Sequence, residues 1–288
     1  MATIRFSLVI PCHNGASYIV RCLSSIAQQT FPLDNVEVVF VDDGSTDGSG
    51  IIAERFAEDF PRFQIIKNDA PSGPGGARNR GVEKATGEYL FLVDVDDWLP
   101  PKSLEIIDKA ITDNKNPDVI LFPYRIERPE SSRRTKGLVQ PKIKTIQQAA
   151  FSAVGPWTHV CKTELYVAMP EKIISEDTAW HFAQFDRFDT FANAGGDEPC
   201  YVYDRTNATA ITDTVEWAGD NSFTLEQLAF GDAAIKAGKN DQWISDILRN
   251  FANMYDVRRR LTKPWVKDAW AKRFRSEIAN IMTGHFVH

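Results

Sequence analysis

Short apolar runs alternate with amphipathic segments along the first half of the 288-residue chain. The apolar runs predict strands at residues 6–11, 36–41, 63–67, 90–93 and 119–124. The amphipathic segments predict helices at residues 17–29, 49–60, 77–85 and 102–114. Strands that are apolar on successive positions are typical of sheets covered on both faces. The pattern therefore predicts an α/β fold with a Rossmann-like, mostly parallel sheet flanked by helices.

The second half of the chain has a less regular pattern. Residues 125–144 are polar, basic and rich in Ser, Pro and Gly, as expected of an exposed loop or mobile flap. Structured segments follow at residues 157–164 and 173–185, then a strand-like run at residues 200–203. We therefore expect an α/β domain over residues 1–215 and a helical, basic and amphipathic C-terminal region over residues 216–288.

Composition excludes several classes of protein. The net charge of −6 argues against a nucleic-acid binder that is basic overall. The first residues lack the features of a signal peptide, and no apolar stretch reaches the roughly 20 residues of a membrane helix. We therefore expect a cytoplasmic protein without a transmembrane segment. The four cysteines show no C-x-x-C spacing and indicate neither a zinc site nor a disulfide framework: Cys12, Cys22, Cys161 and Cys200.

Three carboxylates follow the apolar run at Leu90–Val93, namely Asp94, Asp96 and Asp97. Unpaired carboxylates repel one another and resist burial, so a cation is expected beside them. Side chains alternate along an extended chain, which places Asp94 and Asp96 on one face. Such oxygen ligands suit a hard divalent ion that also holds substrate phosphates. The alternative is a solvated turn in which an aspartate caps the next helix.

A glycine-rich loop at Ala70–Gly76 precedes the helix predicted at residues 77–85, which begins with Arg78 and Arg80. Glycines allow a ligand to approach the backbone, and a helix N-terminus with nearby arginines attracts a diphosphate. Loops of this kind are also common as simple turns.

A second acidic cluster, Asp42, Asp43 and Asp47, follows the strand predicted at residues 36–41. In an open α/β sheet, ligands bind beyond the carboxyl ends of the strands, where Asp43 could accept a hydrogen bond from a base or a ribose. For Asp47, capping of the following helix is an equally good interpretation.

Five short motifs, taken together in this order, resemble family 2 glycosyltransferases of the GT-A fold. They are Ser7-Leu-Val-Ile-Pro-Cys-His-Asn14, Val41-Asp-Asp-Gly-Ser-Thr-Asp-Gly48, Gly76-Ala-Arg-Asn-Arg-Gly81, Ala85-Thr-Gly-Glu-Tyr89 and Val93-Asp-Val-Asp-Asp97. The resemblance covers residues 4 to 125, with a weaker continuation to residue 205. It implies a nucleoside-diphosphate sugar donor, UDP-linked in our interpretation, a Mn²⁺ or Mg²⁺ ion, and transfer with inversion by direct displacement.

The resemblance also implies roles for residues around the nucleotide. Pro11 and His13 would border the base, with His13 in place of the more frequent tyrosine, and Asp43 would accept a hydrogen bond from the base. Arg78 would lie near the base or the diphosphate. His13 has a structural alternative, as a strand-end histidine whose ring is already hydrogen-bonded.

The metal and the catalytic base are the next implied groups. Asp96 would ligate the metal directly, and Asp94 would face the ribose and the metal. Direct displacement requires a base for the acceptor hydroxyl, which the family places in a Glu-Asp pair at the start of a helix. Here Ser175 is the predicted N-cap, and Asp177 is preferred to Glu176 as the base. The alternative is that both acids only complement the helix dipole.

Three further residues match weaker parts of the family pattern. Trp157 would stack on the sugar or else pack in the core, and His159 would contact the diphosphate or the acceptor. Arg205 is the candidate for a cationic clamp over the diphosphate.

The acceptor is predicted to be a glycan or a lipid-linked saccharide. The C-terminal region is basic from Met254 onward, with interleaved aromatic residues. This stripe could dock on the catalytic domain, contact an anionic membrane surface peripherally, or bind a DNA acceptor with hydroxylated bases of the phage type. Two other classes remain as alternatives, a nucleotidyltransferase and an inactive scaffold that binds sugar nucleotides.

Overall fold

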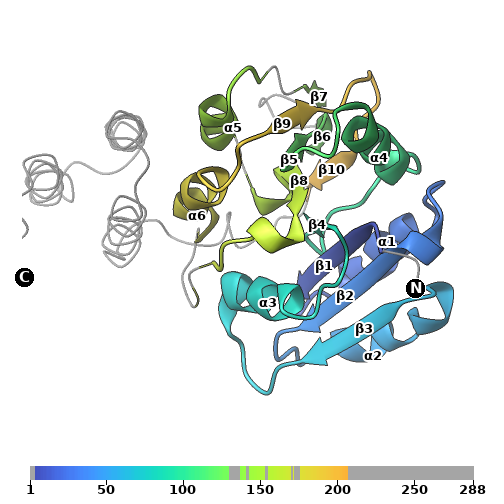
Figure 1. The fold of residues 1–288 in the computed structure, drawn as a ribbon. Helices are drawn as coiled ribbons and strands as arrows, with labels where there is room; N and C mark the ends of the chain where they lie inside the picture. Colours follow the sequence, from blue (N-terminus) through green and yellow to red (C-terminus); the bar gives the residue numbers. More distant parts are fainter. Residues whose placement is uncertain are drawn as a thin grey trace, which may run out of the picture. The chain divides into compact units, whose positions relative to one another are not determined.

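The computed structural model describes residues 4–129, 137–140, 143–152, 155–169, 171 and 176–206. A seven-stranded sheet with strand order β3-β2-β1-β4-β8-β5-β9 forms its centre (Figure 1). Only β8 runs antiparallel to its neighbours β4 and β5. The α/β fold with a mostly parallel sheet is therefore confirmed. The strands are β1 (Phe6–Cys12), β2 (Val36–Asp42), β3 (Phe63–Lys67), β4 (Tyr89–Leu92), β5 (Val119–Leu121), β8 (His159–Lys162) and β9 (Phe191–Asn193).

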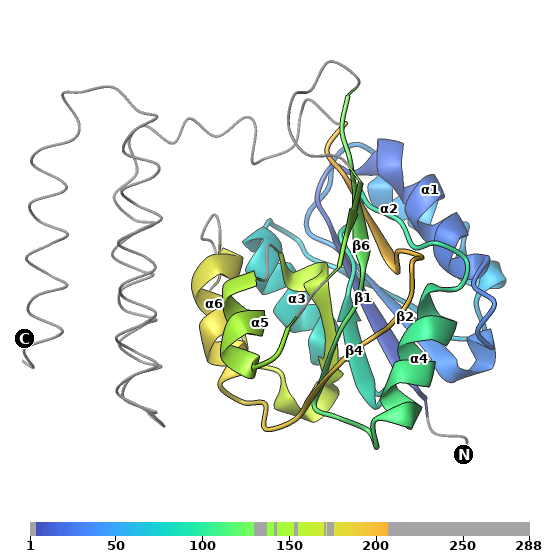
Figure 2. The same cartoon turned by 90° about the horizontal axis from the view of Figure 1, so that it is seen from above.

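Helices cover both faces of this sheet, as Figure 2 shows, with α1, α2 and α4 on one face and α3, α5 and α6 on the other. The helices are α1 (Ala16–Ala27), α2 (Ser49–Glu54), α3 (Gly73–Val82), α4 (Ser103–Asp113), α5 (Ile146–Ser152) and α6 (Glu176–Phe185). Short 3₁₀ turns occur at Leu33–Asn35, Ala57–Asp59, Pro156–Thr158 and Thr163–Leu165. Within the described ranges, no helix has the length and apolar character needed to cross a membrane.

A second sheet corrects two of the predictions. The strand expected at residues 119–124 is two strands, because β5 ends at Leu121 and β6 (Tyr124–Glu127) begins a separate sheet. Pro123 lies between them; a proline has no N–H for a strand ladder, and its carbonyl here accepts a hydrogen bond from Cys200 N–H (2.7 Å). The expected loop at residues 125–144 thus contains most of β6 and all of β7 (Gly137–Val139). Strand β10 (Tyr201–Asp204) completes the order β10-β6-β7.

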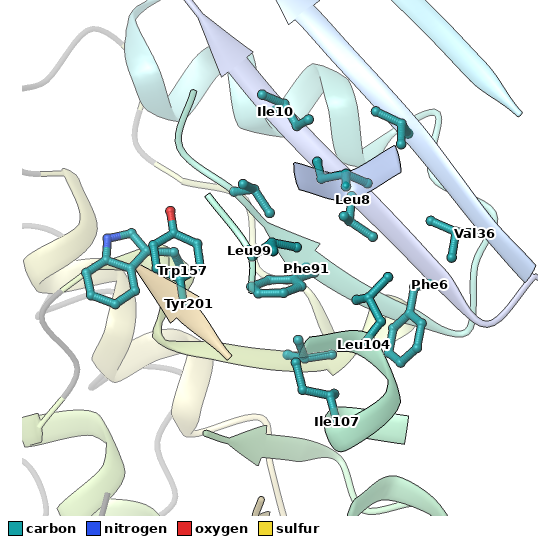
Figure 3. Packing of buried hydrophobic residues seen from close by; sticks show 14 of the residues in the cluster. Phe6, Leu8, Ile10, Val36, Phe91, Leu99, Leu104, Ile107, Trp157 and Tyr201 are labelled. Carbon is teal, nitrogen blue, oxygen red and sulfur yellow. The ribbon is translucent and has the colours of Figure 1, made fainter. Parts of the chain in front are cut away.

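The main core lies between the sheet and helices α1 and α4. Phe6, Leu8 and Phe91 project from β1 and β4 toward Leu104 and Ile107 of α4 (Figure 3). All five are fully buried. Burying a large apolar side chain contributes about 1.5–3 kcal/mol, so this layer holds β1 and β4 in a fixed register. The carboxyl ends of these strands are therefore rigidly placed.

A buried carboxylate fixes the turn that enters β4. Glu37 of β2 accepts hydrogen bonds from Gly87 N–H (3.0 Å), from the N–H and hydroxyl of Thr86, and from the hydroxyl of Ser7. A Cβ atom on Gly87 would lie 2.6 Å from that Ser7 hydroxyl oxygen, so only glycine fits. The Thr86-Gly87 motif is thus part of the framework that holds β4 beside β1.

The order of the strands reverses at β1. The chain passes from β1 through β2 to β3 in one direction and then places β4 on the other side of β1. Ligands of open α/β sheets bind at such a reversal. The helical region predicted for residues 216–288, and its boundary with the α/β domain, lie outside the described residues and stay predictions.

Candidate active site

The three carboxylates after β4 have different environments. Asp97 is fully buried: its Oδ1 accepts from Asp204 N–H (2.8 Å) and its Oδ2 from the Tyr201 hydroxyl (2.6 Å). That hydroxyl also accepts from Asp94 N–H (3.1 Å). Burial, together with the charges of Asp96 and Asp94, raises the pKa of Asp97 well above its usual range. Asp97 is therefore an internal anchor that joins the β4 end to β10.

Asp94 and Asp96 are partly exposed at the carboxyl end of β4. The Asp94 Oδ1 atom forms an ion pair with Arg78 Nη2 of α3 (2.7 Å). Burial, followed by the negative charge of Asp94, raises the pKa of Asp96 to about 6. A carboxylate with a raised pKa lies where negative charge is insufficiently compensated. Asp97 has internal hydrogen-bond donors and Asp94 is paired with Arg78, so Asp96 is the carboxylate of this trio that is left to take up a further cation.

The carboxylates at this edge suit a hard divalent ion whose remaining ligands come from the substrate. In the part of the chain that the structure describes, no three His, Cys, Asp or Glu side chains are grouped so as to hold a metal by themselves. Mg²⁺ is usually bound through one or two carboxylates together with substrate phosphates, and Mn²⁺ accepts the same oxygen ligands. Asp96, with Asp94 beside it, supplies that kind of partial site.

Arg21 of α1 is a site residue that the sequence analysis missed. Its Nη1 forms an ion pair with Asp204 Oδ2 (2.7 Å), and its guanidinium lies 4.2 Å from the centre of the Trp98 ring. It also donates to the main-chain oxygen of Asp96 (2.5 Å). Arg21 therefore fixes the peptide that carries Asp96. No local pattern could have revealed this contact, because the partners come from two segments, residues 96–98 and β10, that are distant from α1 in the sequence.

The N-terminus of α3 already has an anionic partner within the protein, and the predicted contact of this segment with a diphosphate stays a prediction. Helix α3 begins at Gly73, so the glycines form its first turn. The buried Asp43 carboxylate accepts from Ser72 N–H (2.9 Å), the Ser72 hydroxyl (2.8 Å), Gly73 N–H (3.0 Å) and the Asn68 amide (2.6 Å). These four donors fill the roughly four acceptor positions of a carboxylate. A base N–H would have to replace one of them, and the Ser72 hydroxyl is the donor that can rotate away.

The exposed His13 side chain follows the buried Pro11 at the β1 end and has a defined tautomer. Its Nδ1 lies 2.7 Å from the Asp43 carbonyl oxygen, which can only accept, so Nδ1 carries the proton. Its Nε2 then accepts from the Asn14 side-chain amide (3.1 Å). Asn14 has a φ of 53° and accepts from Thr46 N–H (2.9 Å), which ties this turn to the loop after β2. These contacts hold the His13 ring in one orientation at the carboxyl end of β1.

Asp47 caps two helices, which favours the structural interpretation of this residue. It accepts from Ala16 N–H (2.9 Å) at the start of α1 and from Ser49 N–H (3.0 Å) at the start of α2. Burial is the largest single influence on its pKa and raises it, but the hydrogen bonds from Ser49 and Ala16 together outweigh this effect, and the pKa is lowered.

Trp157 and His159 are buried beside the site. Trp157 is 2% exposed, with its ring stacked on Tyr201 (4.6 Å between centres, 5° between planes; Figure 3). It also packs against Tyr124 in an edge-to-face arrangement. His159 packs on Phe185 of α6 (4.8 Å). Burial lowers the pKa of His159 well below its usual range. These contacts favour core packing for Trp157, and the donor contacts predicted for both residues stay predictions.

The predicted base lies in the first turn of α6. Asp177 is half-buried and shares a helix face with Trp180, His181 and Gln184, at spacings of three, four and seven residues. Burial and, to a smaller extent, the charge of Arg78 lower the pKa of His181 to about 4. Helix α6 lies beside α3. The predicted N-cap, residue 175, lies outside the described residues, and the Glu176 side chain is not described.

Arg205 directly follows β10. Its Nη1 donates to the Tyr203 hydroxyl (2.9 Å), and its guanidinium lies 5.6 Å from the centre of that ring. This contact orients the Arg205 guanidinium at the end of β10, the strand that is hydrogen-bonded to Asp97.

Known proteins resemble this chain most over its first half. A profile of the family described as "Glycosyl transferase family 2" matches residues 7–166, more than half of the chain. The "Putative glycosyltransferase EpsH" of Bacillus subtilis is 37% identical over 127 residues, 44% of this chain and 36% of that protein. The "Poly(ribitol-phosphate) beta-N-acetylglucosaminyltransferase TarS" of Staphylococcus aureus is 35% identical over 123 residues, 42% of this chain and 21% of TarS. The matched region thus spans little more than a third, or less, of these relatives.

Solved structures agree with this result at the level of the fold. The S. aureus TarS structure in complex with UDP-GlcNAc superposes with a TM-score of 0.74 at 23% identity, covering 86% of this chain and 72% of that one. The mannosyltransferase PcManGT of Pyrobaculum calidifontis, in complex with GDP-Man and Mn²⁺, gives a TM-score of 0.56 at 18% identity, covering 99% of this chain and 77% of that one. Similarity at this level shows the GT-A fold expected from the sequence. The chain belongs to glycosyl transferase family 2.

Proposed function

We propose that the chain is a metal-dependent, inverting glycosyltransferase that moves a sugar from a UDP-sugar to an acceptor hydroxyl. The observation that carries this proposal is the Asp94–Asp96 pair at the carboxyl end of β4, where Asp94 is neutralised by Arg78 and Asp96 is not. Two structural neighbours support the class of donor, because TarS was solved with UDP-GlcNAc and PcManGT with GDP-Man and Mn²⁺.

The donor would lie across the carboxyl ends of the neighbouring strands β1 and β4. The neutral His13 ring would stack on the base above Pro11, and Asp43 would accept from the base in place of the Ser72 hydroxyl. Arg78, held by Asp94, would place positive charge near the diphosphate, and Arg205 would do so from β10.

Transfer would proceed as a direct displacement at the anomeric carbon. Asp96 and Asp94 would hold a Mn²⁺ or Mg²⁺ ion, which would supply positive charge beside the departing diphosphate. Asp177, or Glu176 in its place, would take the proton of the acceptor hydroxyl as that oxygen attacks the anomeric carbon. The bond from the sugar to the diphosphate breaks as the new glycosidic bond forms, which inverts the configuration.

The acceptor is proposed to be a glycan or a lipid-linked saccharide. Two relatives, TarS and a beta-glucosyltransferase of Bacillus spizizenii, are named as poly(ribitol-phosphate) glycosyltransferases. The basic tail on which the DNA and membrane alternatives depend lies outside the described residues. Among the described residues, no contact favours the DNA acceptor or the membrane contact. The described contacts also do not distinguish a cytoplasmic location from a membrane-peripheral one.

The experiment is a donor screen with Mn²⁺ in which release of UDP is measured with and without saccharide acceptors. We expect acceptor-dependent release that a chelator abolishes and that Mn²⁺ restores. Asp96→Asn should lose this activity, whereas Asp113→Asn, which removes an exposed surface ion pair to Lys109, should retain it. Full activity in the chelator or in Asp96→Asn would overturn the metal requirement.

The base is tested separately by Asp177→Asn. We expect this variant to bind UDP-sugar as the wild type does in calorimetry and to lose transfer. Turnover equal to that of the wild type would exclude Asp177 as the base and make Glu176→Gln the next variant to measure.

A further inference from the structure

A short segment between β8 and α6, Leu165–Met169, lies between helices α3 and α6; we refer to it as the strap. On the α6 side, Trp180 Nε1 donates to Val167 O (2.6 Å). Gln184 accepts from Val167 N–H (2.7 Å) and donates to Leu165 O (3.0 Å). Three hydrogen bonds from two buried α6 side chains therefore fix the strap to the helix that carries Asp177.

On the α3 side, the strap is held by Asn79. Its Nδ2 donates to Met169 O (2.9 Å), and its Oδ1 accepts from Met169 N–H (2.8 Å) and from the Tyr166 hydroxyl (2.8 Å). One amide side chain thus satisfies both main-chain groups of Met169 in the manner of a strand neighbour. Net stabilisation per hydrogen bond is modest, but leaving these main-chain groups unpaired would be costly.

Arg78, the residue before Asn79 on α3, contacts one of the carboxylates after β4. Arg78 pairs with Asp94 at the β4 end (2.7 Å) and approaches the Met169 sulfur (3.9 Å). Consecutive residues of a helix point about 100° apart, so Arg78 and Asn79 reach two different structures from one turn. The turn at Arg78-Asn79 therefore connects the metal-side carboxylates to the strap and, through it, to α6.

We propose that Asn79 is a positioning residue for the catalytic base. It fixes the strap, and the strap fixes the face of α6 on which Asp177 lies, relative to the carboxylates after β4. This role rests on the proposed function, with Asp177 as base. The side-chain hydrogen bonds of Asn79 go to the strap, so its loss is expected to displace the base while donor affinity is kept. Misplacement of a reacting group by about 1 Å costs on the order of 10²-fold in rate.

Steady-state transfer by full-length variants tests this role. Asn79→Ala should lower kcat about 100-fold while calorimetric affinity for the UDP-sugar, in the presence of Mn²⁺, stays within about twofold of wild type. Asn79→Asp keeps the hydrogen bonds that Asn79 Oδ1 accepts from Met169 and Tyr166, and it should recover much of the lost kcat. Tyr166→Phe removes only one of these hydrogen bonds and should show the smallest loss of kcat. Where Asn79→Ala does not fold, the last two variants carry the test.

Asn114→Ala is the matched control, because it removes an amide hydrogen bond to Ala110 O (2.8 Å) at the end of α4; its kcat should equal that of wild type.

The outcomes separate the two proposals. An inactive wild type, or an Asp177→Asn variant as active as wild type, contradicts the proposed function or its base. A wild type that transfers, an inactive Asp177→Asn variant, and Asn79 variants with unchanged kcat would overturn the positioning role alone. Equal losses of kcat and of donor affinity in Asn79→Asp would also overturn it, because they would indicate a general loss of structure.

Discussion

Replacing Asp43 by Asn would disturb the hydrogen bonds that hold the start of α3 against the β2 end. The retained amide oxygen can still accept from Asn68 and Ser72, but an NH₂ group then faces Gly73 N–H (3.0 Å). Two donors, that N–H and the new amide, are left without an acceptor at a side chain that is 3% exposed. At about 1–3 kcal/mol for each unsatisfied buried group, the substitution should cost roughly 2–6 kcal/mol. The lost negative charge at the helix N-terminus adds about 0.3–1 kcal/mol.

Urea unfolding followed by circular dichroism measures this cost, with Asp42→Asn as the control. Asp42 is buried at the same strand end, but its carboxylate accepts from Ser45 N–H through Oδ1 alone (3.0 Å), a bond that an amide oxygen retains. We expect Asp42→Asn to lose no more than about 1 kcal/mol, at an unchanged m-value for both variants. Equal and small losses for the two variants would refute the idea that Asp43 organises the α3 terminus.

Three further substitutions test the framework around the site. Glu37→Gln should lower the free energy of unfolding by about 2–4 kcal/mol, because an amide cannot accept from every donor of the Thr86–Gly87 turn; urea unfolding measures it. Gly81→Ala would place a Cβ atom 2.3 Å from a Val9 methyl, so overpacking should cost about 1–3 kcal/mol, and an unchanged Tm would contradict this. Burial raises the pKa of Asp47, but its capping hydrogen bonds lower it below 3.8, so its ionised form stabilises the fold. The advantage of the wild type over Asp47→Asn should therefore be present at neutral pH and disappear as the pH falls through the lowered pKa, as measured by unfolding at several pH values.

The sequence predicted those elements whose signal is local. Strand β3 has the predicted bounds. Strands β1 and β2 differ from the predicted strands by one residue, because strands covered on both faces leave uninterrupted apolar runs. Helix α3 was predicted to start at Ala77, four residues late. Its first turn is rich in glycine, which usually opposes a helix, and the anion that stabilises it comes from the distant Asp43.

Within the site, residue types were predictable but their partners were not. The acids after β4 are recognisable from composition and position, and the structure gives each a different environment. Their division into an internal anchor, Asp97, and two edge carboxylates depends on Tyr201 and Arg21, which lie in segments far from β4. For Trp157, a sugar platform and a core residue share the same sequence signal, and only the stacked Tyr201 ring distinguishes them.

The anchoring of Asp97 sets a minimum length for any functional fragment of this chain. The family profile ends at residue 166, but both hydrogen-bond donors to the Asp97 carboxylate come from residues 201–204. A fragment cut at the end of the profile would leave that carboxylate inside the protein without them, at a cost that is large compared with the stability of a small domain. Domain exchange between members of this family should accordingly keep the Asp94–Asp97 segment and β10 from the same parent.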